Sequence, residues 1–181
     1  MGSLSYAGRI LVARPDISDP NFDITITMVI EHTEEGALGL VLNRPSEVAV
    51  QETFAEWSEM VVDPPTVFAG GPVGIGSVIA LGRSDQVDGE LVHNMHPVDL
   101  QQQPSLVAGS GVEQVRIFGG YAGWGPGQLE GELANKGWWV VDGSADDVFS
   151  SQPSRLWAEV MGRQKGELAW YAHYPLDPSA N

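Results

Sequence analysis

This chain contains no cysteine, and its apolar runs are short. Without thiols it forms neither disulfides nor thiolate-based metal and iron–sulfur sites, and such a composition suits a reducing compartment. No run approaches the roughly 18 apolar residues that a membrane span needs. The first residues also lack the basic and apolar regions of a signal peptide. We therefore expect a cytoplasmic protein that does not enter a membrane.

Basic side chains are also scarce, which disfavours direct nucleic-acid binding. The chain carries 24 acidic residues against nine basic ones, a formal net charge of −15, and only Lys136 and Lys165 are lysines. Proteins gain affinity for DNA by neutralising phosphates with lysine and arginine, so a uniformly acidic surface repels a duplex. We interpret the charge as a source of solubility.

The hydrophobic pattern predicts a single domain over 1–181 that contains a mixed sheet. The length and the 43% apolar content allow a full core. A hairpin turn is expected at 33–36 and a loop at 14–23. The predicted strands are 9–13, 24–31, 37–42, 66–69, 77–81, 114–118 and 138–141, with shorter candidates at 90–93 and 106–108 and a further turn or strand at 168–174.

Helical spacing is clearest at 50–61, where Val50, Phe54, Trp57 and Val61 recur on one side. The prolines that follow would end this helix. Further helices are predicted at 126–136, after the N-cap Ser144, and at 153–163. Hairpins mixed with strand–helix–strand units favour a mixed sheet over a doubly wound parallel one.

Residues 117–132 form the most informative segment. They are expected to contain the end of a strand, a loop of glycines and aromatics over 119–125, and the start of a helix. Glycines let the backbone turn tightly or approach another group closely. Aromatic side chains and carboxylates placed in such a loop could hold a ligand.

Three segments, 43–45, 70–72 and 120–124, each follow the carboxyl end of a predicted strand. If those strands are parallel neighbours, the segments converge on one cleft, as ligand-binding loops do in open α/β sheets. Arg44 would contact an anion with its guanidinium, the backbone would approach the ligand at Gly71, aromatics would stack on it, and polar side chains would orient it. The candidate ligand-binding residues are Asn43, Arg44, Gly71, Tyr121, Trp124, Gln128 and Glu130.

Other motifs do not point to a specific reaction. His93 and His96 lack an obvious third metal ligand. The glycine-rich segment 70–77 lacks the ending of a phosphate-binding Walker loop, so a tight connection between two strands explains it as well. No nucleophile elbow is present. We therefore assign no catalytic residue, no metal and no cofactor, and keep Glu130 or His32 as a general base only within an alternative hypothesis.

The segments Ile30-Glu31-His32, Gly36 to Pro45, Gly70-Gly71-Pro72-Val73 and Gly120 to Glu132 together resemble the YqgE/AlgH family of bacterial proteins. This resemblance covers residues 9 to about 165. It implies an α+β fold with a mixed, bifurcated β-sheet curled into a pseudo-barrel and flanked by helices. The family supplies no established activity or catalytic residues. Some members carry the label of transcriptional regulator, but this chain shows no helix-turn-helix.

These observations lead to a leading hypothesis and two alternatives. The leading hypothesis is a non-catalytic regulatory protein that binds a small anionic ligand or a protein partner with the candidate residues. The first alternative is an enzyme with an unrecognised site. The second is a transcriptional regulator that contacts DNA directly, which would need a basic stripe despite the overall charge.

Overall fold

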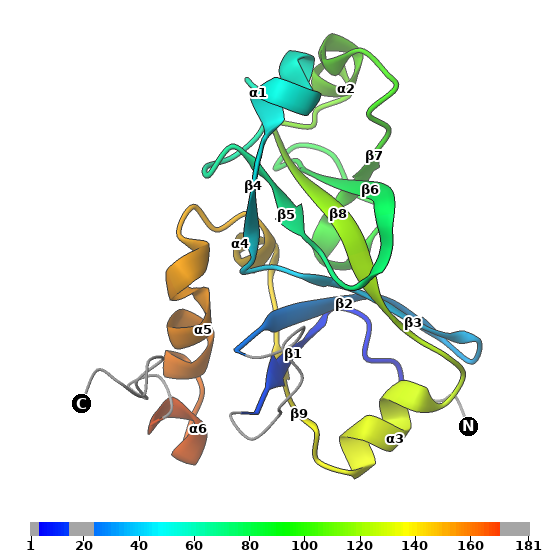
Figure 1. Cartoon of the computed structure of the whole chain (residues 1–181), viewed down its shortest axis with the longest axis vertical. Coiled ribbons are helices and arrows are strands. Elements are labelled where there is room, and N and C mark those ends of the chain that lie inside the picture. The colour runs from blue at the N-terminus through cyan, green and yellow to red at the C-terminus, as the bar shows by residue number, and fades with distance from the viewer. Residues whose placement is uncertain (1–3, 15–23, 171–181) are drawn as a thin grey trace.

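The computed structural model of the chain describes residues 4–14 and 24–170. Most of the loop predicted at 14–23, and the end of the element predicted at 168–174, lie outside these residues. Within them the fold is α+β, with a nine-stranded mixed sheet flanked by short helices (Figure 1). No helix in this part of the chain is long and apolar enough to cross a membrane.

The sheet is mixed because one of its strand pairs, β5 with β8, is parallel while the other pairs are antiparallel. Its main path runs β4 (Pro45–Ala49), β5 (Thr66–Ala69), β8 (Gln114–Trp124), β3 (Gly36–Val41), β2 (Ile26–Thr33), β1 (Arg9–Ala13) and β9 (Trp138–Asp142). A branch from β8 carries β6 (Val73–Arg83) and β7 (His96–Val98). The sheet therefore divides at β8 and does not close, which confirms the predicted bifurcated α+β architecture.

Short helices cover the sheet. They are α1 (Val50–Thr53), α2 (Pro104–Gly109), α3 (Gln128–Ala134), α4 (Ala145–Val148), α5 (Pro153–Gly162) and α6 (Glu167–Trp170), with 3-10 turns at Ala55–Trp57 and Val92–Asn94. The predicted cap at Ser144 is confirmed, since Ser144 and Asp147 form a capping box at the start of α4. The helix predicted at 153–163 is confirmed as α5.

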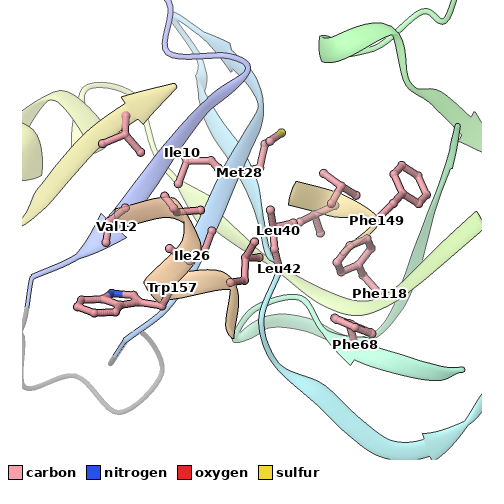
Figure 2. Packing of buried hydrophobic residues seen from close by; sticks show 14 of the residues in the cluster. Ile10, Val12, Ile26, Met28, Leu40, Leu42, Phe68, Phe118, Phe149 and Trp157 are labelled. Carbon is pink, nitrogen blue, oxygen red and sulfur yellow. The ribbon is translucent and has the colours of Figure 1, made fainter. Parts of the chain in front are cut away.

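The core lies on both faces of β1 and β2. Ile10 and Val12 of β1 pack in the cluster that α5 covers with Trp157, as Figure 2 shows. Leu11 and Ala13 point to the opposite face and pack beneath α3. Because both faces are covered, Thr27 of β2 is buried as well.

The helix predicted at 50–61 is confirmed only at its start, as α1 and the 3-10 turn at Ala55–Trp57, and is wrong as a continuous helix. The chain leaves helical geometry at Phe54, where φ is −131° and ψ is 53°. The indole of Trp57 is buried and donates to the Leu100 carbonyl at 3.3 Å. Beyond it, Val61 forms a bridge to Val115 of β8. Burial around Trp57 and pairing with β8 therefore outweigh the local helical spacing.

The glycine and aromatic loop predicted at 119–125 is also wrong over most of its length, because β8 continues as a strand to Trp124. A Cβ at Gly120 would lie 2.5 Å from the Gly71 carbonyl oxygen, so glycine here permits close strand contact. Helix α3 starts at Gln128, after Gly127 in a left-handed conformation. The strand candidates at 90–93 and 106–108 are instead a 3-10 turn and part of α2.

Candidate functional site

The three segments predicted to converge do come together, but as paired backbone rather than as loops around a cleft. The amide of Ala69 donates to the Arg44 carbonyl at 2.8 Å, and that of Gly70 donates to the Gly119 carbonyl at 2.8 Å. A Cβ at Gly71 would lie 2.1 Å from the Tyr121 carbonyl carbon. The assumption of parallel neighbours holds for β5 and β8 but fails for β3 and β8, which are antiparallel.

Asn43 has a structural role in this arrangement. Its Oδ1 accepts from the Ile26 amide at 3.0 Å, and its Nδ2 donates to the Ile24 carbonyl at 2.9 Å. These two bonds tie the end of β3 to the start of β2 across a position where Ile24 has a φ of 55°. Both polar ends of the Asn43 amide are thus engaged within the fold.

Three other candidates, Trp124, Gln128 and Glu130, gather at α3. Glu132 is the centre of a polar cluster there. Its Oε2 accepts from the indole N–H groups of Trp124 at 3.0 Å and Trp138 at 2.9 Å. Its Oε1 accepts from the side-chain Nε2 of Gln128 at 3.2 Å. We define Glu132, Trp124 and Trp138 as the indole clamp. It fixes the end of β8 and the start of β9 to α3.

Glu130, two residues earlier, contacts His32 on β2. The distance between His32 Nε2 and Glu130 Oε1 is 2.7 Å, and His32 Nδ1 lies 3.0 Å from the Tyr6 amide nitrogen. Since an N–H can only donate, Nδ1 is an acceptor, so Nε2 carries the proton and donates to Glu130. The pKa of Glu130 is lowered, first by a hydrogen bond from its own backbone amide and further by the hydrogen bond from His32.

This geometry gives little support to His32 as a general base. Its side chain is 3% exposed, and the lone pair on Nδ1 is occupied by the Tyr6 amide. A base must reach the proton that it removes and must have a free lone pair to accept it. In this arrangement His32 has neither access to a substrate proton nor a free lone pair. The contact instead joins the N-terminal segment, β2 and α3.

The histidines at 93 and 96 have separate structural partners. His93 Nε2 lies 2.6 Å from the Gly8 carbonyl, and His96 Nε2 lies 3.2 Å from the Val87 carbonyl. Among the described residues no group of three or more metal-ligating side chains could hold an ion.

An open hollow of about 220 Å³ lies at the β2–β3 hairpin, next to the end of β8. We call it the hairpin hollow. Its lining consists of Glu31, Thr33, Glu35, Gly36, Ala37, Leu38 and Trp124. In Figure 1 this hairpin projects beside the segment that leads from β8 to α3. Of the predicted site residues, only Trp124 contributes to it.

Comparison with known proteins places this architecture in a family. A model described as AlgH-like matches residues 10–169. The chain belongs to the AlgH-like family. A UPF0301 protein of Streptomyces avermitilis is 46% identical over 186 residues, covering 98% of this chain and 96% of the relative. The UPF0301 protein SCO2948 of Streptomyces coelicolor is 45% identical, with the same coverage.

Two solved structures share this AlgH-like fold. Protein DIP2367 from Corynebacterium diphtheriae has a TM-score of 0.87 and 31% identity, and the match covers 95% of this chain and 94% of that one. The AlgH protein from Pseudomonas aeruginosa has a TM-score of 0.69 and 29% identity, with 97% of each chain covered. These matches support the fold and the family, and they assign no reaction.

In this AlgH-like chain, sequence reasoning missed the acidic side of the hairpin hollow. Glu31 and Thr33 are two residues apart on β2, so they share one face of the strand, and Glu35 follows in the turn. That alternation was visible in the sequence. However, the turn residues were interpreted only as a connection between strands, and the position of β8 beside them depends on long-range pairing.

Proposed function

We propose that this AlgH-like chain is a non-catalytic binding protein, and that the hairpin hollow receives a side chain from a protein partner. The observation that carries this proposal is the shape of the hollow. Its volume of about 220 Å³ is below the range of about 300–1,000 Å³ that is typical of pockets enclosing small molecules. An open hollow of this size suits a single protruding side chain better than an enclosed metabolite.

The lining indicates the chemistry of that side chain. Glu31 and Glu35 contribute carboxylates, and the other lining residues carry no charge. Arginine matches carboxylates with a planar fork of donors, and charge-assisted bonds of this kind are stronger than neutral ones. The net charge of −15 would also steer a basic partner toward this surface. We therefore propose a partner that presents arginine.

The distribution of cations argues against direct contact with DNA. Arg9, Arg83, Arg155 and Arg163 each form an ion pair with an aspartate or glutamate of this chain. Arg116 is 1% exposed. These five arginines are thus engaged within the chain or buried, which disfavours their neutralising phosphates. A regulatory role for this chain would accordingly proceed through the protein partner.

The experiment is an NMR titration of the ¹⁵N-labelled chain with a tri-arginine peptide. We expect backbone signals of residues 31–38 to shift, and Glu31→Gln combined with Glu35→Gln to weaken binding about tenfold, since exposed ion pairs contribute up to about 1 kcal/mol each. Glu34→Gln is the matched control, because Glu34 is exposed in the same turn but does not line the hollow. Shifts spread over the whole acidic surface, or equal weakening by the control, would refute the proposal.

A small anionic ligand at Arg44 stays a prediction of the sequence. Arg44 is half-buried at the end of β3, and its carbonyl accepts the Ala69 amide. A thermal-shift screen with inorganic phosphate and nucleotides tests it. The expected result for this ligand is a stabilisation that Arg44→Ala weakens, and an unchanged response in that variant would count against the anion site.

A further inference from the structure

The segment Ser5–Gly8, which we call the N-terminal strap, is held by two histidines from different parts of the chain. The Tyr6 amide donates to His32 Nδ1 at 3.0 Å, and the Tyr6 ring lies 5.6 Å from the His32 ring, centroid to centroid. At the other end, the Gly8 carbonyl lies 2.6 Å from His93 Nε2. The Gly8 amide also donates to the Val29 carbonyl at 2.8 Å.

The two imidazoles contact the strap in opposite roles, one as a hydrogen-bond donor and the other as an acceptor. A carbonyl oxygen only accepts, so His93 donates to the strap through Nε2. A backbone amide only donates, so His32 accepts from the strap through Nδ1. A doubly protonated imidazole donates from both nitrogens. A second proton therefore preserves the contact of His93 with Gly8 and removes the contact of His32 with Tyr6.

The surroundings of His32 decide which partner it keeps when it is charged. Glu130 on α3 faces it with a carboxylate, and the Tyr6 phenol faces it from the strap. On β3 the residue paired with His32 is Ala37, which carries no charge. Glu31 and Thr33, its neighbours on β2, alternate to the other face of the strand. The carboxylate of Glu130 thus retains the imidazolium, while the N–H at Nδ1 of charged His32 and the backbone N–H of Tyr6 point at each other.

We propose that His32 is a proton-operated latch: a second proton on His32 releases the Tyr6 end of the N-terminal strap, while Glu130 keeps the ring on α3 and His93 keeps Gly8 in place. Imidazole is the side chain that ordinarily titrates between about pH 5 and 8. The lowered pKa of Glu130 means that its carboxylate stays ionised through that range. Ion pairing with Glu130 then strengthens as the strap contact is lost.

Release has a consequence for the surface. Tyr6 packs against the apolar cluster beneath α3, which includes Leu11, Val29 and Leu129. Freeing the Tyr6 end of the strap uncovers part of that cluster, and an uncovered apolar patch is a site for association. The latch would thus couple acidification to exposure of an apolar surface that is covered while His32 is uncharged.

The test is NMR on the whole chain between about pH 8 and about pH 5. Imidazole ¹⁵N shifts should show His32 as the Nε2–H form at the upper end. As His32 gains its second proton, the order parameter of the Tyr6 amide should fall from about 0.85 to below about 0.6, while that of Gly8 stays high. Tyr6 remaining rigid beside a protonated His32 would overturn the proposal, as would a His32 that stays neutral throughout.

Two variants sharpen the result. In His32→Gln an amide that does not titrate replaces the imidazole, so the pH-dependent step at Tyr6 should disappear. In His93→Gln the pH-dependent step at Tyr6 should persist, because the contact of residue 93 with the Gly8 carbonyl does not depend on the protonation of His32. A step that survives in His32→Gln would also overturn the proposal. The wild-type comparison of Tyr6 with Gly8 decides the question even if a variant fails to fold.

Discussion

Removing the carboxylate of Glu132 tests whether the indole clamp holds α3 to the sheet. The side chains of Trp124 and Trp138 are 7% and 8% exposed, and both indoles donate to the same carboxylate oxygen. Hydrogen bonds to a charged acceptor contribute about 1.5–3 kcal/mol each. Because Glu132 itself is half-buried, the lower value applies to each of the two bonds. We expect Glu132→Ala to lower the free energy of unfolding by about 3 kcal/mol.

Urea unfolding followed by tryptophan fluorescence measures this loss, with the slope m compared between variants to check that the unfolding transition is unchanged. The matched control is Glu159→Ala on α5, which removes an exposed ion pair with Arg155 at 3.9 Å and a negative charge near Arg163. That control should cost less than about 1 kcal/mol. A Glu132→Ala cost as small as the control's would refute the clamp.

A double-mutant cycle isolates the contribution of one indole. Trp138→Phe removes the N–H donor while it keeps an aromatic ring at the end of β9. If the bond is as described, Glu132→Ala should cost about 1.5 kcal/mol less in the Trp138→Phe background than in the wild type. Additive effects of the two changes would show that Trp138 and Glu132 do not interact.

Three further predictions follow from the described contacts. Gly71→Ala should lower the free energy of unfolding by about 3 kcal/mol or prevent folding, because the added Cβ would lie 2.1 Å from the backbone of β8. Gly76→Ala is the control: its added Cβ would have no atom within 4 Å, so the free energy of unfolding in urea should change by less than about 0.5 kcal/mol. Asp147→Asn should cost about 2 kcal/mol in the same assay, since a carboxylate that is 3% exposed loses its two-pronged ion pair with Arg163. The folded-state pKa of Glu130 is lowered, so its contribution is present above its ordinary pKa of about 4.5 and is lost as pH falls below it. The stability difference between wild type and Glu130→Gln should therefore shrink as the pH falls below about 4.5, and a difference that grows over that range would contradict this.

Local signals in the sequence predicted the elements whose cause is local. β1 matches its prediction at both ends, and the helix predicted at 153–163 is α5, which buries Leu156, Trp157, Val160 and Met161. The cap at Ser144 was also evident, because a capping box depends only on residues three apart. Such features need no knowledge of the rest of the chain.

Other features depend on long-range pairing and were predicted poorly. The segment after Phe118 contains glycines that locally favour a loop, but β3, β5 and β6 all pair with β8 and hold it extended. Residues 50–61 have helical spacing, yet Trp57 is buried by a cluster that includes Val107, far along the chain. In both places tertiary contacts outweigh local preference.

The same distinction explains the outcome at the candidate site. Segments 43–45, 70–72 and 120–124 were chosen because each follows a strand, and backbone hydrogen bonds of Arg44 with Ala69 and of Gly70 with Gly119 bring them side by side. Glycine served there to let strands approach, so Gly71 and its neighbours are explained by packing. A motif of glycines after a strand therefore indicates close contact, and only the geometry tells whether the contact is with a ligand or with another strand.

The strand β2 shows how one short segment can carry two separate tasks. Its side chains alternate, so Glu31 and Thr33 are available to the hairpin hollow while His32 faces the N-terminal strap and α3. Carboxylates on the first face would attract a basic partner whether or not His32 is protonated. The imidazole on the second face would respond to pH whether or not a partner is bound. Binding and release can therefore be separated by substitutions at adjacent positions, because changing Glu31 leaves the hydrogen bonds of His32 in place and changing His32 leaves the lining of the hollow in place.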